Sequence, residues 1–343
     1  MNVIEYLYYA IHLANMGRRL KRMRYLPQKV VSVGNVTLGG TGKTPAVIAL
    51  ASEALRRGLK VAVLTRGYGG KGKGALLVST GAGPLVGFEE GGDEPVLMAA
   101  KLRGVEVIKG ADRYAAAGLS AGTDLFILDD GFQRVDVHRD IDVVLVDSIK
   151  GFGNGRLFPL GPLREPVSAL SRAHFIVETN SPGSAAPEKK KTYPAPLEGA
   201  GSTGVATNPP FVYSAVHKPV ALLSRAGTSL PLSTIESVPV TAFCGIGNPM
   251  GFKRSLQSLG ALVVHLETFP DHHLYRSQDL KRVLKKAGSC KWIITTEKDI
   301  IKLGGWPDLE NLLALAVEFQ VGGDFYDKVF GMAGFCDRRD NII

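Results

Sequence analysis

The sequence predicts an α/β protein with a doubly wound, mostly parallel sheet followed by a second, smaller α/β domain. Apolar runs of strand length alternate with helical or loop segments, which is typical of a mostly parallel sheet covered by helices. The 343 residues exceed the usual size of one domain, so two packed cores are expected. Residues 181–210 are rich in Pro, Gly, Ser, Ala and Lys and lack periodicity, so they are predicted to be a flexible insertion.

The predicted elements follow from the spacing of the apolar residues. The first domain begins with a strand at 29–34, a Gly-rich turn and a helix at about 43–57, and its further strands are expected at 61–65, 105–108, 125–128, 143–146 and 175–177. The second domain has strand-like runs at 238–244, 262–267, 292–296 and 313–319 and helical patterns at 250–259 and 278–287. We therefore expect an N-terminal amphipathic helix at 1–28, a first domain at 29–235 that carries the insertion, and a smaller C-terminal domain at 236–343.

Composition restricts the possible classes of partner. With 45% hydrophobic and 21% charged residues, the chain has enough apolar material for a packed core, which excludes global disorder. The 41 Lys and Arg residues against 32 Asp and Glu residues favour anionic partners, without choosing between nucleotides, acidic lipids and nucleic acid. The three cysteines, Cys244, Cys290 and Cys336, lie too far apart for a zinc or disulfide framework, so a reducing, cytoplasmic setting is the simplest interpretation.

The N-terminal segment has two interpretations of equal weight. Ile4, Leu7, Ile11 and Ala14 recur at helical spacing, and six basic residues between 18 and 29 follow them. Such a helix can lie in a membrane interface, or it can pack on its own domain. No run approaches the roughly 20 apolar residues that cross a bilayer. A cleaved signal peptide is less favoured, because its basic residues should precede the apolar run.

The strongest chemical signal is a phosphate-binding loop. It consists of Thr37, Leu38, Gly39, Gly40, Thr41, Gly42, Lys43 and Thr44. Glycines let backbone N–H groups surround phosphates, the lysine reaches the β and γ oxygens, and the threonine hydroxyl binds Mg²⁺. The strict motif has glycine where Thr37 stands, but the predicted strand and helix on either side support the assignment. A purely structural glycine turn is the weaker alternative. The loop predicts a P-loop NTPase-like fold for the first domain.

A nucleotide site of this kind needs an acidic group for the metal. The run at 125–128 delivers Asp129 and Asp130 to the carboxyl edge of the sheet, and Gln133 follows after a tight turn. We favour the pair Asp129 and Asp130 as the acidic group for Mg²⁺, and the hydroxyl of Thr44 can bind the same ion. Asp147 ends the run at 143–146 in a similar way, although a helix cap or structural hydrogen bond explains it at least as well.

Other candidate groups lie farther along the chain. Asp93 and Glu94 follow two glycines, either as functional carboxylates or as an ordinary helix N-cap. Residues 269–275 gather Asp271, two imidazoles and a phenol, which is typical of acid/base equipment. Adjacent histidines lack the usual spacing of paired zinc ligands. The charges at 296–299 either meet the same cleft or form a solvated cap, and residues 245–249 are expected to form a tight strand-to-helix connection.

Seven segments occur in an order that resembles one known family. They lie at 32–45, 66–70, 92–95, 128–133, 161–166, 269–273 and 296–299. The set is similar to the tetraacyldisaccharide 4′-kinases (lipid A 4′-kinases), and the resemblance runs from about Tyr6 to Lys302.

The resemblance implies that ATP and Mg²⁺ are cofactors and that residues 29–235 form a P-loop kinase domain. It implies transfer of the γ-phosphate to the 4′-hydroxyl of a tetraacylated glucosamine disaccharide 1-phosphate, giving lipid IVA, by a peripheral protein on the cytoplasmic face of the bacterial inner membrane. It implies that Asp93 works with His272 to activate the acceptor hydroxyl, while Lys43, Thr44 and Asp130 hold the phosphates and metal. Because Asp93 and His272 belong to different domains, closure of the two lobes would complete the site. An acylated, anionic substrate also favours the membrane interpretation of the N-terminal helix.

Several further residues are candidates for substrate or phosphate contacts. Arginine binds phosphate oxygens in a bidentate manner, so Arg113, Arg156 and Arg164 are candidates for phosphate contacts. Ordinary surface salt bridges are an equally weighted alternative for each of them. Arg66 and Tyr68 are expected to line the cleft. Glu94 and Gln133 complete the set of possible contacts.

Two rival functions remain. A nucleotide-switched metallochaperone or targeting ATPase has the same loop but needs no acceptor base, so the His-bearing second domain argues against it. A nucleic-acid-binding ATPase ranks last, because the basic residues concentrate before Gln28 instead of forming a stripe with aromatics. We predict no nucleic-acid partner and no protein partner.

Overall fold

The computed structural model describes residues 2–335 apart from 73, 121, 180–192, 194–209, 305 and 308. Cys336 and nearly all of the predicted insertion at 181–210 lie outside the described residues. The strands are β1 (Lys29–Gly34), β2 (Val61–Thr65), β3 (Leu76–Ser79), β4 (Glu106–Lys109), β5 (Leu125–Asp129), β6 (Ile141–Asp147), β7 (Phe175–Thr179), β8 (Phe211–Ser224), β9 (Ser229–Leu230), β10 (Pro239–Cys244), β11 (Leu262–Thr268), β12 (Trp292–Thr296) and β13 (Leu312–Val321). The α-helices are α1 (Val3–Leu20), α2 (Lys43–Arg56), α3 (Phe88–Gly91), α4 (Asp93–Lys101), α5 (Arg113–Ala117), α6 (Pro249–Ser258), α7 (Ser277–Ala287), α8 (Glu297–Ile300) and α9 (Phe325–Met332). Two 3₁₀ helices, η1 (Val167–Arg172) and η2 (Leu232–Ile235), connect them.

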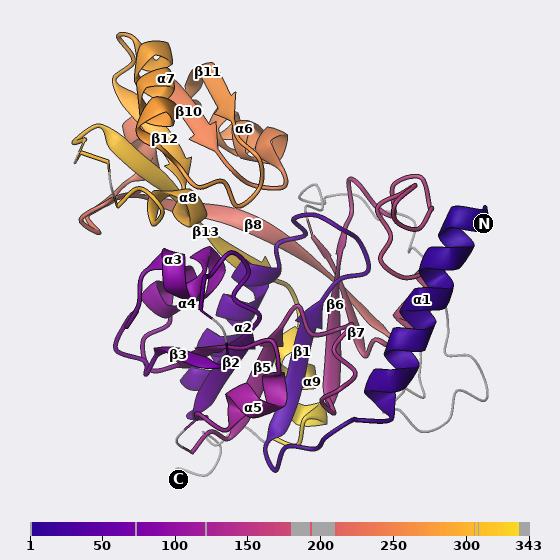
Figure 1. Ribbon diagram of the computed structural model, residues 1–343. Helices are drawn as coiled ribbons and strands as arrows, with labels where there is room; N and C mark the ends of the chain where they lie inside the picture. The colour runs from indigo at the N-terminus through magenta and orange to yellow at the C-terminus, as the bar shows by residue number, and fades with distance from the viewer. Residues whose placement is uncertain are drawn as a thin grey trace.

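One mostly parallel sheet runs through both lobes of the molecule. Its strand order is β11-β10-β12-β13-β8-β7-β6-β1-β5-β2-β4-β3, with β9 paired to β8. The described antiparallel pairs are β3 with β4, β8 with β9, and β8 with β13. Figure 1 shows the long strands β8 and β13 passing from the larger lobe to the smaller one. The α/β fold with a mostly parallel sheet is therefore confirmed.

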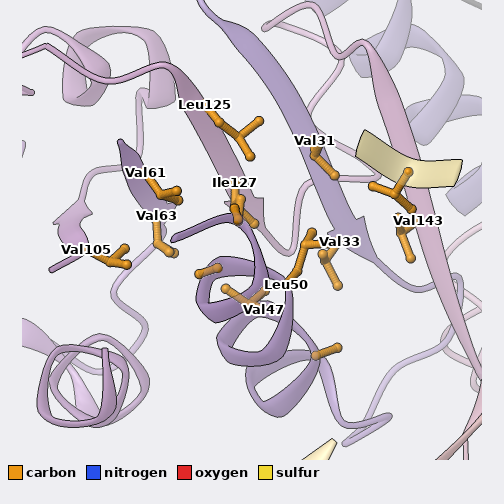
Figure 2. Packing of buried hydrophobic residues seen from close by; sticks show 14 of the residues in the cluster. Val31, Val33, Val47, Leu50, Val61, Val63, Val105, Leu125, Ile127 and Val143 are labelled. Atoms are coloured by element: carbon orange, nitrogen blue, oxygen red, sulfur yellow. The ribbon is translucent and has the colours of Figure 1, made fainter. Parts of the chain in front are cut away.

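The larger lobe has its core between the sheet and α2. Alternate residues of neighbouring strands face the helix, as the two-residue period of a strand requires. Figure 2 shows Val33 and Ile127 of the sheet close to Val47 and Leu50 of α2. All four are at most 2% exposed. Burying a side chain of this size stabilises the folded state by roughly 1.5–3 kcal/mol. This packing fixes the start of α2 against the end of β1, where the phosphate loop lies.

The smaller lobe has a core of its own. Leu256 of α6 packs with Val240, Ile294 and Leu313 of three neighbouring strands. A second cluster places Phe243, Phe269 and Trp306 on the other face of these strands. The smaller lobe therefore buries apolar side chains on both faces of its strands.

The C-terminal helix belongs to the larger core. Phe325, Val329 and Phe330 of α9 are buried in the cluster that contains α2. The predicted division at residue 236 assigns this helix to the smaller domain, whereas its apolar face covers the larger lobe. We therefore keep the smaller domain as a proposal only for residues 236–321, which end with β13.

The strand β8 was not predicted. Its residues include Pro219, and several of its apolar side chains, such as Phe211 and Val212, are exposed. Buried apolar residues are the main signal of a strand, and here that signal is weak. The other predicted strands and helices are present within one or two residues, except that the helix predicted at 1–28 ends at Leu20.

The N-terminal helix turns an apolar face outward. The capping box between Asn2 and Glu5 starts α1, and buried Glu5 accepts hydrogen bonds from Arg156 and from Leu157 N. Tyr8 and Tyr9 pack against the larger lobe. The residues of the predicted stripe point away from the lobe: Ile4, Leu7, Ile11 and Ala14 are all exposed.

Asp142 and Arg139 form a buried pair beneath β1. Arg139 donates to Asp142 through Nε at 2.8 Å and Nη2 at 3.0 Å. Burial raises the pKa of Asp142, but Arg139 and the Ser32 hydroxyl outweigh burial and lower it below the ordinary value. We expect Asp142→Asn to lower the free energy of unfolding by about 3 kcal/mol, because it leaves Arg139 buried without its counter-charge.

The pH dependence follows from the sign of that shift. A lowered pKa in the folded state adds stability that is fully present above about pH 4 and is lost as the pH falls further. Urea denaturation should show the gap between wild type and Asp142→Asn unchanged from pH 7 to 5 and smaller below pH 4. Asp140→Asn, whose partner Lys29 is half-exposed, is the control and should cost less than about 1 kcal/mol. Equal effects of both variants would contradict the prediction.

Candidate functional site

The phosphate loop leaves the carboxyl end of β1 and leads into α2 (Figure 1). Gly39 and Gly42 have φ angles of 107° and 84°, which residues with a Cβ rarely adopt. Gly42 is the N-cap of α2, so the helix begins directly at Lys43. Leu38 N donates a 2.7 Å hydrogen bond to the Pro162 carbonyl, which holds the outer side of the loop. The expected strand, loop and helix are therefore all present.

Lys43 lies among oxygen ligands at the base of the loop. Its ammonium is 3.2 Å from Asn35 Oδ1 and 3.3 Å from Asp130 Oδ1. Asn35 also donates to Thr41 Oγ1 at 3.1 Å, so the side chain of Asn35 links both ends of the loop. Thr44 is nearly buried in the first turn of α2. The loop and its lysine are thus held in place by residues of the same lobe.

Two carboxylates end β5 beside this lysine. Asp130 meets Lys43 and accepts two hydrogen bonds from Arg164, at 2.9 and 3.1 Å. Burial opposes its ionisation, yet Lys43 and Arg164 lower the pKa of Asp130. Asp129 accepts a 2.8 Å hydrogen bond from Thr65 Oγ1, and burial together with the charges of Glu94 and Asp130 raises its pKa to about 7.

These residues fit a divalent cation. The hydroxyl of Thr44 and the carboxylates of Asp129 and Asp130 are hard oxygen donors, which Mg²⁺ prefers. The raised pKa of Asp129 indicates negative charge that a cation would stabilise. Asp147, the competing carboxylate, accepts hydrogen bonds from Ile149 N and Lys150 N, so it caps a turn.

A polar frame surrounds the loop. Gln133 donates to the Asn35 carbonyl at 2.9 Å and to Glu165 Oε1 at 2.8 Å. Arg164 is 3.4 Å from Gln133 Oε1. Arg172 donates to Glu165 at 2.7 Å. Arg164 and Gln133 therefore lie beside the phosphate loop.

Two other predicted arginines lie elsewhere. Arg113 is 1% exposed and donates to the Gly110 and Asp129 carbonyls, so it supports the end of β5 from beneath. Burial and the charge of Arg134 lower its pKa to about 10. Arg156 pairs with Glu5 of α1 and joins the N-terminal helix to the larger lobe. Both arginines are engaged with the protein itself.

The carboxylate and imidazole predicted to work together are in contact. Asp93 begins α4 of the larger lobe, and His272 follows β11 of the smaller lobe. His272 Nδ1 lies 2.9 and 3.0 Å from the two Asp93 oxygens. Burial opposes ionisation, but the hydrogen bond from His272 and the charge of Lys298 lower the pKa of Asp93. The ring of Tyr68, which is exposed, lies 4.8 Å from that of His272.

The smaller lobe also reaches the phosphate loop directly. Residues 245–249 form the expected tight connection between β10 and α6, in which Asn248 caps the helix. A Cβ at Gly247 would lie 2.7 Å from Gly40 N. Lys150 Nζ donates to the Gly247 carbonyl at 3.3 Å. The smaller lobe therefore contacts the phosphate loop and also supplies His272 to the pair with Asp93.

His273, next to the paired histidine, has a different environment. His273 Nε2 lies 3.0 Å from Asp279 Oδ2 in α7, whereas His272 faces the other lobe. The two imidazoles thus serve separate carboxylates and do not share a ligand site.

Residues that the sequence did not single out complete the site. Lys298 contacts Glu94, Asp271 and His272, although only its segment was noted as meeting the cleft. His217 of β8 packs against Gly42, and burial lowers its pKa. Its strand was not predicted, so the sequence held no signal for this contact.

The chain is similar over most of its length to proteins of one family. The family model described as tetraacyldisaccharide-1-P 4′-kinase matches residues 2–331. The tetraacyldisaccharide 4′-kinase of Syntrophus aciditrophicus (strain SB) is 44% identical over 301 residues, which are 83% of this chain and 78% of that protein. The tetraacyldisaccharide 4′-kinase of Geobacter sulfurreducens is 38% identical over 291 residues, 84% of this chain and 78% of that protein. A crystal structure described as the "apo" form of LpxK from Aquifex aeolicus in complex with ATP has a TM-score of 0.74 and 31% identity, covering 96% of this chain and 97% of that chain.

The packing at Gly42 predicts a specific loss of nucleotide binding. In Gly42→Ala the added Cβ would lie 2.3 Å from His217 Nε2 and force the loop to move, in addition to the strain of its positive φ. We expect ATP affinity to fall about tenfold or more, measured by titration with a fluorescent ATP analogue.

Gly58→Ala is the matched control for this test. Gly58 has a φ of 80°, and its Cβ would meet open space. The control therefore carries the same backbone strain without the contact, and it should bind ATP as wild type does. Equal affinity of the two variants would show that the contact with His217 does not position the loop.

Proposed function

The chain belongs to the tetraacyldisaccharide 1-phosphate 4′-kinase family, and we propose that it transfers the γ-phosphate of ATP to the 4′-hydroxyl of a tetraacylated glucosamine disaccharide 1-phosphate. The product is the bis-phosphorylated lipid A precursor, lipid IVA. The observation that carries the proposal is that the lobe in contact with the phosphate loop also brings His272 to Asp93. A nucleotide-switched metallochaperone or targeting ATPase is less well supported, because it needs no group that activates an acceptor hydroxyl.

The residues divide between phosphate binding and proton transfer. Lys43 and the backbone of the loop would neutralise the β and γ phosphates, with Arg164 and Gln133 beside them. A bond forms from the 4′-oxygen to the γ-phosphorus, and the bond to the β,γ-bridging oxygen breaks, so ADP leaves with that electron pair. Asp93 would accept the hydroxyl proton. Glu94 and Tyr68, beside this pair, are proposed to contact the substrate.

Thr44 and Asp130, with Asp129 behind them, are proposed to hold Mg²⁺. When bound, the ion supplies positive charge to the phosphates. The side chains themselves contribute oxygen ligands at the end of β5 and the start of α2, which are joined through Lys43.

We propose a peripheral position on the cytoplasmic face of the bacterial inner membrane, with α1 in the membrane interface. The exposed side chains Val3, Tyr6 and Leu13 add to the apolar stripe and give this helix an outward apolar face. No helix among the described residues combines the length and apolar character that a membrane span requires. Burying such a face in lipid would stabilise the bound state in proportion to its apolar area.

The end of α1 adds a basic hollow to this face. It has a volume of about 480 Å³ and is lined by Arg18, Arg19, Arg22, Arg24 and Asp136. Arg19 also donates to the carbonyl of Gln133, which brings the hollow next to the phosphate site. Guanidinium groups bind phosphate oxygens well, so this hollow suits the anionic lipid surface or the phosphate of a lipid substrate.

The proposed reaction has a direct test. Purified protein with Mg-ATP and tetraacyldisaccharide 1-phosphate in mixed micelles should add one phosphate to the lipid, followed by mass spectrometry. Lys43→Ala should lower the rate at least about 10²-fold, because a cation that stabilises the transferred charge is lost. Lys60→Ala, on an exposed lysine after α2, is the control and should keep the wild-type rate. Hydrolysis of ATP with an unchanged lipid would instead support the switch function.

The membrane proposal is tested separately. Leu7→Glu with Ile11→Glu should lower binding to phosphatidylglycerol–phosphatidylethanolamine vesicles about 10²-fold in sedimentation, because two exposed apolar side chains no longer enter lipid. Leu262→Glu with Val264→Glu, on the exposed edge strand β11, is the matched control and should leave binding unchanged. Equal binding of both double variants and wild type would exclude α1 as the contact.

A further inference from the structure

A nearly buried lysine of the smaller lobe joins the Asp93–His272 pair. Lys298 lies in α8, and its side chain is 16% exposed. Its ammonium is 3.2 Å from Glu94 Oε1, 3.2 Å from Asp271 Oδ1 and 3.2 Å from His272 Nε2. It also lies 3.9 Å from Asp93 Oδ2. One cation therefore meets both lobes at the place where the proton is proposed to be accepted.

These contacts determine which nitrogen of His272 carries the hydrogen. A lysine ammonium has three donors and no acceptor, so the Nε2 that faces it must accept. In a neutral imidazole the hydrogen is then on Nδ1, which faces the acceptor oxygens of Asp93 at 2.9 and 3.0 Å. A protonated imidazole would instead direct an N–H at the ammonium of Lys298. The arrangement is satisfied by only one form of the ring.

The same lysine also holds the backbone that presents this ring. His272 has a φ of 59°, in the left-handed region that residues with a Cβ adopt only at a cost. Its N–H donates to Asp271 Oδ1 at 3.0 Å, and Lys298 binds that same oxygen. The lysine thus fixes both the turn and the ring.

Lys298 is itself fixed by the short helix that carries it. Thr296 caps α8 by accepting a hydrogen bond from Asp299 N. Buried Asp299 accepts from Gly245 N at 3.0 Å and pairs with Lys302 at 2.8 Å. Lys302 in turn lies 3.8 Å from Asp93 Oδ2. The position of Lys298 therefore depends on the core of the smaller lobe and not on a flexible surface loop.

We propose that Lys298 is a positioning residue for the phosphoryl transfer: it donates to His272 Nε2, keeps the ring hydrogen on Nδ1 and so directs that hydrogen at Asp93, which accepts the hydroxyl proton. This inference rests on the function proposed above. The proton of the 4′-hydroxyl moves to Asp93 as the oxygen–phosphorus bond forms and ADP departs. Lys298 keeps its own protons throughout.

The charges around Asp93 support this role. Burial raises the pKa of Asp93, but the hydrogen bond from His272 and the charges of Lys298 and Lys302 outweigh it. Glu94 and Asp271 face the lysine from α4 and from the turn before His272, and both, together with Asp93, raise the pKa of Lys298 against burial. Tyr68 covers the ring from the larger lobe. The lysine stays charged and the carboxylate stays ionised.

The kinetic test compares Lys298→Met with Lys298→Arg in the full chain. Lys298→Met should lower kcat about 10²-fold and change KM for ATP less than about twofold, because the lysine acts on the proton acceptor and not on the phosphate loop. Its acidic limb in the profile of kcat/KM against pH should move up by about one unit, since loss of a nearby cation raises the pKa of Asp93. Lys298→Arg keeps the charge and should recover much of both properties.

A second measurement does not depend on turnover. Long-range ¹H–¹⁵N spectra of histidine-labelled protein, with His272 assigned through His272→Gln, should show hydrogen on Nδ1 alone in the wild type. In Lys298→Met the signal should move toward a mixture of the two neutral tautomers, because Nε2 no longer faces an ammonium donor. A wild-type protein that phosphorylates no lipid would overturn the proposed function, while these spectra would still test the lysine.

The control is Lys285→Met, on an exposed position of α7 in the same lobe. It should retain the wild-type rate, pH profile and histidine spectrum. Thermal unfolding of each variant identifies any that fail to fold. A folded Lys298→Met protein with kcat within about twofold of wild type, or with the wild-type histidine spectrum, would overturn the inference.

Discussion

Burial of negative charge is the constraint on which the site depends, because a carboxylate taken from water must be paired with donors or cations. Asp130 meets Lys43 and Arg164, and Asp93 meets His272 with Lys298 behind it. Asp129 accepts from a neutral hydroxyl, and its raised pKa marks the point where further positive charge would stabilise the protein. The proposed nucleotide and metal site thus lies at the part of the sheet edge where the buried carboxylates have the fewest cationic partners.

The two long strands determine how the lobes meet. β8 pairs with β7 at one end and with β13 along the rest, so the sheet continues from one core into the other. Where the register of this pair shifts near Val317, Glu297 accepts from Val317 N at 3.1 Å and pairs with Lys101 of the larger lobe at 2.7 Å. A change in the pairing of β8 with β13 would move His272 and Lys298 together relative to Asp93. The ion pair between the lobes and the pairing of β8 with β13 therefore depend on each other.

Much of the fold was predictable, because buried strands and amphipathic helices leave a period in the sequence. The loop at 37–44 and the approach of Asp93 to His272 were also predictable, the first from its spacing and the second from a resemblance. Half-exposed β8 has no such period, so neither it nor the contact of His217 with Gly42 was foreseen. Lys298 lies about two hundred positions from Glu94, and only the folded sheet brings them together. The apolar face of α9 gave no indication of which core it covers.

Lys43 of the larger lobe and Lys298 of the smaller lobe have different roles, which follow from the charge of the proposed substrate. A triphosphate that enters beside Lys43 brings several negative charges, and like charges raise the pKa of a nearby carboxylate. Asp93 would then hold a proton up to a higher pH, so less of the protein would carry the ionised carboxylate that can accept the hydroxyl proton. Lys298 and Lys302, both on the smaller lobe, oppose this effect because they add positive charge within 4 Å of that carboxylate. The cations that keep this carboxylate ionised therefore belong to the lobe that also contacts the phosphate loop, and the proposed closure of the two lobes would bring these cations to Asp93.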